Sequence, residues 1–169
     1  DLGRARLQEL GELTRGALAE MRTLLNELRP SALVQTDLDD LLTQLTEAVI
    51  ARARLPVTLE IDGDFEGLPV DVKIALYRIA QEALNNVVKH AHATSAEIRL
   101  TGDASALSLC IADDGRGFEP RRVTSERLGL SIMRERAETV GAILKLETAS
   151  EGGTEVWVTW EQAEGGSGV

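Results

Sequence analysis

The chain has 169 residues, 43% hydrophobic and 27% charged, which fits one globular domain or one domain with an appended helical segment. Its 18 basic and 28 acidic residues give a net charge of -10, and this acidic balance argues against a nucleic-acid-binding surface. Because no apolar run is long enough to span a bilayer or to act as a signal peptide, we expect a cytoplasmic segment without membrane contact, whether or not the intact protein is membrane-anchored.

The first expected element is a long amphipathic helix from Leu2 to Leu28. Its apolar face recurs at alternating spacings of three and four, which is typical of a heptad seam. The helix should end before Pro30, because the helical conformation is disfavoured for a residue that precedes proline. Since no partner helix is evident in the sequence, we expect self-association or a longer parent protein, and packing on its own domain is the alternative. The seam comprises Leu7, Leu10, Thr14, Ala17, Met21, Leu24 and Leu28.

The rest of the chain alternates between helical and strand patterns. A polar stretch, 119–127, is predicted to form a mobile surface loop, and Gly141 to end the last helix. The lone Cys110 has no disulfide partner, and its place in an alternating strand indicates a packing role. The order of elements predicts an α+β fold, a mixed sheet with helices on one face. Helices are expected at 38–54, 70–91 and 130–140, and strands at 56–61, 96–101, 107–112, 143–148 and 155–160.

A candidate nucleotide pocket begins with Asp113-Asp114-Gly115-Arg116-Gly117-Phe118, which directly follows an apolar-alternating strand. A carboxylate at that point can accept a hydrogen bond from a purine amino group, and the glycines let the backbone pass close to a ligand. Ordinary turns also require Asp and Gly, so the interpretation of this motif depends on its companions.

The companion motif lies on the preceding predicted helix. Glu82, Asn86, Lys89 and His90 project together at spacings of three and four, beside an apolar face. A carboxylate and an amide oxygen can hold hydrated Mg²⁺, and a lysine can reach phosphate oxygens. The alternative is a solvated helix face, and His90 by itself also fits a surface histidine.

Over most of its length the chain resembles the sensor histidine kinases of two-component systems. The row from Glu82 to His90 resembles their N box, and the stretch from Asp113 to Phe118 resembles their first glycine box. Residues 128–137 resemble the second glycine box, and Gly152-Gly153-Thr154 resembles the third. The helix end at residues 21–30 is similar to the subfamily whose response regulators carry helix-turn-helix output domains.

The resemblance implies a two-layer α/β sandwich, the Bergerat ATP-binding fold, with a mixed sheet and a preceding long amphipathic helix. It assigns 1–30 to the second helix of a dimerisation hairpin, 31–162 to the ATP-binding catalytic domain and 163–169 to a flexible tail. The implied enzyme is a protein histidine kinase that uses ATP and Mg²⁺. The implied partners are ATP or ADP, the dimerisation helix missing from this chain, a second copy in the intact homodimer, and a response regulator.

The resemblance also implies roles at the base-binding end of the site. Asp113 would accept a hydrogen bond from the adenine amino group, with support from Thr154 and an ordered water. Gly115 and Gly117 would let the backbone wrap the base and ribose. Phe118 would pack under a lid formed by residues 119–127.

At the phosphate end, the resemblance makes Asn86 a ligand of Mg²⁺ and gives Glu82 the task of orienting the water shell of that ion. Lys89 would contact phosphate oxygens, and His90 is counted with the nucleotide-binding residues. Glu82, Asn86 and Lys89 together form the implied catalytic set. The amides of Gly129 and Leu130, expected to open a helix, would bind phosphate as helix N-termini generally do.

Two departures from the family pattern bear on function. Arg127 stands two positions before Gly129, where the second glycine box usually has another glycine, and we expect it to contribute charge instead of a close backbone approach. The phosphoacceptor histidine is missing, because the chain has only His90 and His92 and neither precedes the first helix. We therefore expect a fragment that begins after the phosphorylated helix and binds ATP without phosphorylating itself.

Two other functions remain open at this point. Glu82, four residues before Asn86, also fits an ATPase or serine kinase of the same fold, in which a glutamate activates water or a hydroxyl. Arg127 fits a non-catalytic dimerisation or interaction module whose pocket has degenerated.

Overall fold

The computed structural model describes residues 30–117, 124–148 and 152–163, together with the helical positions 6, 11 and 14. The rest of the predicted heptad helix, Phe118 with the first part of the predicted lid, and the tail from residue 164 lie outside the described residues. In chain order the elements are α2 (Pro30–Gln35), α3 (Leu38–Ala53), β1 (Val57–Asp64), α4 (Val70–Asn86), the π-helix η1 (Val87–Ala91), β2 (Ala96–Asp103), β3 (Ala106–Asp113), α5 (Thr124–Thr139), β4 (Ile143–Thr148) and β5 (Thr154–Glu161).

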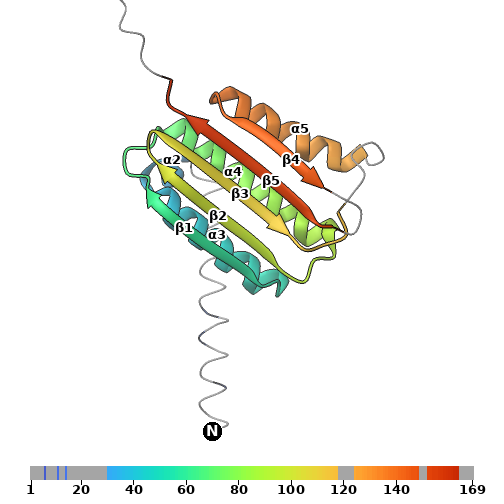
Figure 1. Cartoon of the computed structure of the whole chain (residues 1–169). Coiled ribbons are helices and arrows are strands. Elements are labelled where there is room, and N and C mark those ends of the chain that lie inside the picture. Colours follow the sequence, from blue (N-terminus) through green and yellow to red (C-terminus); the bar gives the residue numbers. More distant parts are fainter. Residues whose placement is uncertain are drawn as a thin grey trace, which may run out of the picture.

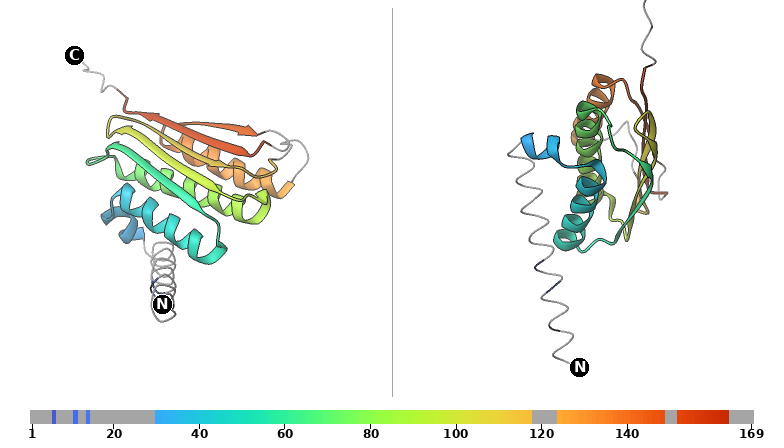
Figure 2. Two further views of the ribbon diagram at one scale, coloured as in Figure 1. Left: turned by 60° about the horizontal axis from the view of Figure 1, so that its bottom comes forward. Right: turned by 90° about the vertical axis from the view of Figure 1, so that its left-hand side faces the viewer.

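The described strands form one five-stranded sheet in the order β1-β2-β3-β5-β4. The pairing of β1 with β2 is parallel, and the other three pairings are antiparallel, so the sheet is mixed as expected. Helices α3, α4 and α5 lie side by side over one face of the sheet (Figures 1 and 2). The predicted two-layer α+β sandwich is therefore confirmed.

The core lies between the sheet and the helix layer. Residues of β2 and β5 alternate between buried and more exposed positions, so that one side of each strand contacts the helices. Removing a large aliphatic side chain from water contributes roughly 1.5–3 kcal/mol, which makes this layer the main source of stability. Fully enclosed members include Leu41, Leu42, Leu76, Ile79, Leu84, Ile98, Leu100, Leu109, Met133 and Val158.

Several predicted boundaries are confirmed by the structure. Helix α3 matches the prediction for 38–54 within one residue, and α4 together with η1 covers the predicted 70–91. Gly141 ends the last helix as predicted, with φ +73, and the amide of Ala142 donates to the carbonyl of Ala137 over 2.9 Å, as in a Schellman motif. Local periodicity and glycine placement were sufficient signals for these elements.

The predicted loop 119–127 is wrong for residues 124–127, because α5 begins at Thr124 rather than near Leu130. The stretch carries Ser, Glu and Arg without glycine or proline, and charged residues of this kind favour a helix once an apolar segment continues it. Helix α2 was not predicted. Its first residue, Pro30, fits the first position of a helix, where a missing N–H costs nothing.

Lys73 connects α2 to α4. Its side chain is buried, and its Nζ donates a hydrogen bond of 2.9 Å to the carbonyl of Val34 in the last turn of α2. A cation at this place satisfies one of the carbonyls that a helix C-terminus leaves without an intrahelical partner.

None of the helices in the described ranges is both long and apolar enough to cross a membrane.

Candidate functional site

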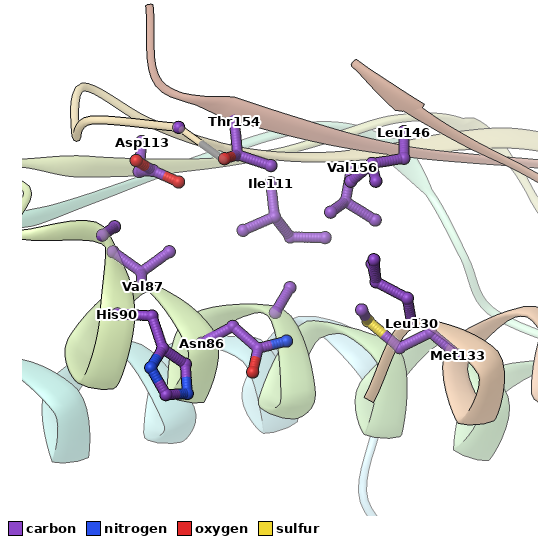
Figure 3. Close-up of a pocket in the computed structure, with 13 residues that line it drawn as sticks. Asn86, Val87, His90, Ile111, Asp113, Leu130, Met133, Leu146, Thr154 and Val156 are labelled. Carbon is purple, nitrogen blue, oxygen red and sulfur yellow. The ribbon is translucent and has the colours of Figure 1, made fainter. Parts of the chain in front are cut away.

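A pocket lies between the helix layer and the sheet, at the end of the sheet where β3 ends and β5 begins. Its empty volume is about 560 Å³, a figure that includes the open solvent at its mouth. Figure 3 shows side chains of the sheet on one wall and side chains of α4, η1 and α5 on the other. The lining residues are Ala83, Asn86, Val87, His90, Ala91, Ile111, Asp113, Gly117, Leu130, Met133, Leu146, Thr154 and Val156.

Asp113 and Thr154 stand together on the sheet wall. They are cross-strand partners of β3 and β5, and Figure 3 shows both side chains at the same end of the pocket. Burial raises the pKa of Asp113, the amide of Gly115 opposes this by donating a hydrogen bond of 2.8 Å, and the negative charge of Asp114 adds to the rise. A half-buried carboxylate beside a hydroxyl, over an apolar floor, can bind the amino group of a planar heterocycle.

The first glycine box lies directly against the end of η1. A Cβ on Gly115 would come within 2.4 Å of the carbonyl oxygen of Ala91, and the amide of Arg116 donates to that same oxygen over 2.9 Å. Gly117 has φ +60 and lines the pocket. Glycine is required at position 115 because no side chain can occupy the space between the two backbones.

The helical wall contributes Asn86 and His90 to the pocket, as shown in Figure 3. Lys89 is exposed, and neither it nor Glu82 is among the lining residues. The four residues were expected to project together, but α4 widens into the π-helix η1 at Val87, and this changes the angular spacing of the residues that follow. The structure therefore brings Asn86 and His90 to the cavity and leaves Lys89 exposed to solvent, outside the lining.

Glu82 lies next to the backbone of α5. A Cβ on Gly129 would be 2.5 Å from Oε1 of Glu82 and 3.4 Å from Nδ2 of Asn86, so Gly129 marks the close crossing of α5 over α4. The absence of a side chain at position 129 leaves room for both polar groups. Glu82 and Asn86 thus both lie next to Gly129, and of the two only Asn86 lines the pocket.

The expectation that Gly129 and Leu130 open a helix is wrong. Since α5 begins at Thr124, both residues lie in its second turn, where amides bond to carbonyls one turn earlier in the same helix. Leu130 instead contributes an apolar side chain to the pocket. The side chain of Arg127 lies outside the described part of the structure, and the proposed charge of that residue at the site stays a prediction.

The apolar lining of the pocket was not predicted from the sequence. Strand alternation was the available signal for the sheet residues, because each occupies the same face of its strand as the core positions. Met133 and Leu130, three apart on α5, could have been assigned to one face by helical periodicity. The lining residues missed in this way are Ala83, Val87, Ala91, Ile111, Met133, Leu146 and Val156.

Comparisons with known proteins agree with this geometry. Residues 71–164 match the family described as "Histidine kinase-, DNA gyrase B-, and HSP90-like ATPase". The sensor histidine kinase LiaS of Bacillus subtilis is 33% identical over 153 residues, which are 90% of this chain and 42% of LiaS. The sensor protein VraS of Staphylococcus epidermidis is 32% identical over 149 residues, 88% of this chain and 42% of VraS. The chain thus spans well under half the length of these relatives.

Among solved structures, the ATP-binding domain of PrrB from Mycobacterium tuberculosis superposes with a TM-score of 0.57 at 25% sequence identity. The match covers 76% of this chain and 96% of that domain. The likeness therefore extends over nearly the whole of a separately solved ATP-binding domain.

Proposed function

Because the chain belongs to the histidine kinase-, DNA gyrase B- and HSP90-like ATPase family, we propose that it is the cytoplasmic catalytic part of a two-component sensor kinase. In this proposal it binds ATP in the pocket and supplies the γ-phosphoryl group to a histidine on a dimerisation helix outside this chain. The phosphoryl group then passes to a response regulator. The observation that carries the proposal is the half-buried Asp113 carboxylate beside Thr154, on the wall of an apolar pocket opposite the helical wall that contributes Asn86 and His90.

The base end of the pocket provides selectivity for adenine. Asp113 accepts a hydrogen bond from the exocyclic amino group, and Thr154 supplies a neighbouring hydroxyl. Ile111, Val156 and Met133 exclude water from the faces of the ring, so the hydrogen bond to Asp113 forms in a medium of low dielectric constant, where it is stronger than in water. Guanine carries a carbonyl in place of that amino group. Its carbonyl oxygen, a hydrogen-bond acceptor, would face the Asp113 carboxylate, which is also an acceptor.

The phosphate end is formed by α4 and η1. Asn86 and Glu82 fit a hydrated Mg²⁺, because this ion keeps several waters and takes only one or two protein ligands beside substrate phosphates. Among the described residues no cluster of three or more acidic, histidine or cysteine side chains is arranged to hold a metal ion. When bound, the ion would neutralise phosphate charge, while His90 and Lys89 orient the phosphates for in-line transfer.

The test is calorimetric titration with ADP and a non-hydrolysable ATP analogue, with and without Mg²⁺, using GTP as control. Adenine-selective binding that Mg²⁺ strengthens would support the proposal. Asp113→Asn should weaken ADP binding by roughly 10- to 100-fold, the equivalent of one hydrogen bond to a charged group. Asp103→Asn, at the opposite end of β2, is the matched control and should bind like the wild type; near-equal affinity in both variants would contradict the role of Asp113.

The phosphoryl acceptor is tested separately. The chain is mixed with a separately produced dimerisation segment that contains the acceptor histidine, and phosphohistidine is followed from labelled ATP. Transfer to the histidine supports the kinase, whereas rapid ATP hydrolysis by the chain alone, lost in Glu82→Gln, would favour an ATPase of the same fold. Absence of nucleotide binding would favour the interaction module.

A further inference from the structure

Asp114, the residue after the base-binding carboxylate, is exposed but closely held. Its Oδ1 accepts hydrogen bonds from the amides of Thr94 over 2.7 Å and Ser95 over 2.9 Å. Its Oδ2 accepts from the hydroxyls of the same two residues, over 2.5 Å and 3.0 Å. These bonds, those of the Thr94 hydroxyl first, hold the pKa of Asp114 well below its usual range. One carboxylate thus bonds four donors of the segment between η1 and β2.

The backbone adds further bonds between the same two segments. The amide of Asp114 donates to the carbonyl of Ser95 over 3.3 Å, and the amide of Arg116 donates to the carbonyl of Ala91 over 2.9 Å. Gly115 lies in the chain between Asp114 and Arg116, and its backbone is close to Ala91. The first glycine box is therefore fastened to residues 91–95 on both sides of Gly115.

This arrangement connects the two walls of the pocket. Asp113 is joined directly to Asp114, while Ala91 ends the helix that presents Asn86 and His90. Any rotation of the backbone at Asp114 would turn the Asp113 carboxylate and change its distance from the helical wall. A displacement of about 1 Å in a binding group is enough to cost two orders of magnitude in function.

We propose that Asp114 is a positioning residue, which sets the orientation of Asp113 and the width of the pocket through Thr94 and Ser95. The proposal rests on the function argued above, in which Asp113 binds the adenine amino group. Asp114 itself does not contact the nucleotide in this proposal. Its four hydrogen bonds determine where the neighbouring carboxylate points.

The chain offers a matched control at the other end of the sheet. Asp103 is also exposed, and its Oδ1 accepts hydrogen bonds from the amide of Ser105 over 2.7 Å, its hydroxyl over 2.6 Å, and the amide of Ala106 over 3.0 Å. These bonds hold the pKa of Asp103 below its usual range, led by that from the Ser105 hydroxyl. Asp103 thus fastens the β2–β3 turn much as Asp114 fastens the glycine box, but at the end of β2 opposite Ala96, the residue that pairs with Asp113 of the pocket.

The experiment compares Asp114→Ala with Asp103→Ala by calorimetric titration with ADP and IDP, at a temperature where circular dichroism shows both folded. IDP has a carbonyl in place of the adenine amino group, so the ratio of the two affinities reports whether Asp113 is correctly oriented. We expect Asp114→Ala to bind ADP about 10-fold or more weakly and to lose most of the preference for ADP. Asp103→Ala should retain affinity and preference within about twofold, although it also loses hydrogen bonds.

A milder variant covers the case in which Asp114→Ala does not fold. Thr94→Val with Ser95→Ala removes both hydroxyl donors and keeps both amides, and it should lower the ADP to IDP ratio in the same direction by a smaller factor. An unchanged ratio in the folded variants, or an equal loss in Asp103→Ala, would overturn the positioning role. Absence of ADP selectivity in the wild type would instead refute the proposed function itself, and the inference with it.

Discussion

Gly153 and Gly141 provide a matched pair of substitutions that separates backbone strain from a steric contact at the site. Both have nearly the same left-handed conformation, with φ +75 at Gly153 and φ +73 at Gly141. A Cβ on Gly153 would lie 2.0 Å from the carbonyl oxygen of Asp113, whereas a Cβ on Gly141 would meet nothing within 4 Å. The two alanine variants therefore share the strain and differ in the contact.

The expected magnitudes follow from these two contributions. An L-residue in the left-handed region costs about 1–2 kcal/mol, and Gly141→Ala should lose about that much free energy of unfolding. Forcing an extra methyl against fixed backbone typically adds about 1–3 kcal/mol, so Gly153→Ala should lose roughly 2–5 kcal/mol in total. The carbonyl of Asp113 cannot rotate away cheaply, because Asp113 is paired with Thr154 across β3 and β5.

Urea unfolding followed by tryptophan fluorescence measures both variants, since Trp157 and Trp160 lie on β5, directly after the substituted glycine. We also expect Gly153→Ala to weaken ADP binding by moving Asp113, while Gly141→Ala binds as the wild type does. Equal losses of unfolding free energy in the two variants would refute the steric argument. Unchanged ADP affinity in Gly153→Ala would show that the backbone at Asp113 yields without consequence for the site.

Three further predictions concern other parts of the fold. Lys73→Met should lose about 1 kcal/mol of unfolding free energy and speed amide exchange in α2, because it removes the donor to Val34, while the exposed Lys145→Met should change neither. Burial raises the pKa of the Cys110 thiol to about 11. At pH 8 the native protein should therefore react with iodoacetamide at under about a tenth of the rate of the urea-unfolded chain, and equal rates would contradict this burial. The pKa of Asp114 is lower in the folded protein than its unfolded value of about 3.9, so the ionised carboxylate stabilises the fold above that pH, and this contribution is lost as the pH falls further. The difference in unfolding free energy between wild type and Asp114→Asn should therefore shrink in urea titrations below about pH 4. A constant difference would exclude the charge as its cause.

The sequence by itself determined the elements whose signals are local. Alternating apolar residues marked the strands, spacings of three and four marked α3 and α4, and Gly141 marked the end of α5. It also identified Asp113 and Asn86 as chemically suitable residues, through the motifs that contain them. Such signals are readable because they depend on neighbours within a few positions along the chain.

Other features of the site depended on the tertiary structure. Thr154 lies beside Asp113 only because β5 inserts between β3 and β4, and this strand order is not encoded in any local pattern. The widening of α4 at Val87 separates Lys89 from the lining residues, and no single residue type signals a π-turn. The start of α5 at Thr124 was likewise hidden, since polar residues are compatible with both loop and helix.

The hydrogen bonds of Asp114 show the same division most clearly. Asp-Asp-Gly in a sequence is compatible with an ordinary turn, and Thr94 and Ser95 stand about twenty residues earlier without any motif of their own. The antiparallel pairing of β2 with β3 places Ala96 at the start of β2 opposite Asp113 at the end of β3, and only then do the four donors meet the carboxylate. Contacts between distant segments depend on how complete elements pack, so the site was assembled by the fold from residues that the sequence had shown only one by one.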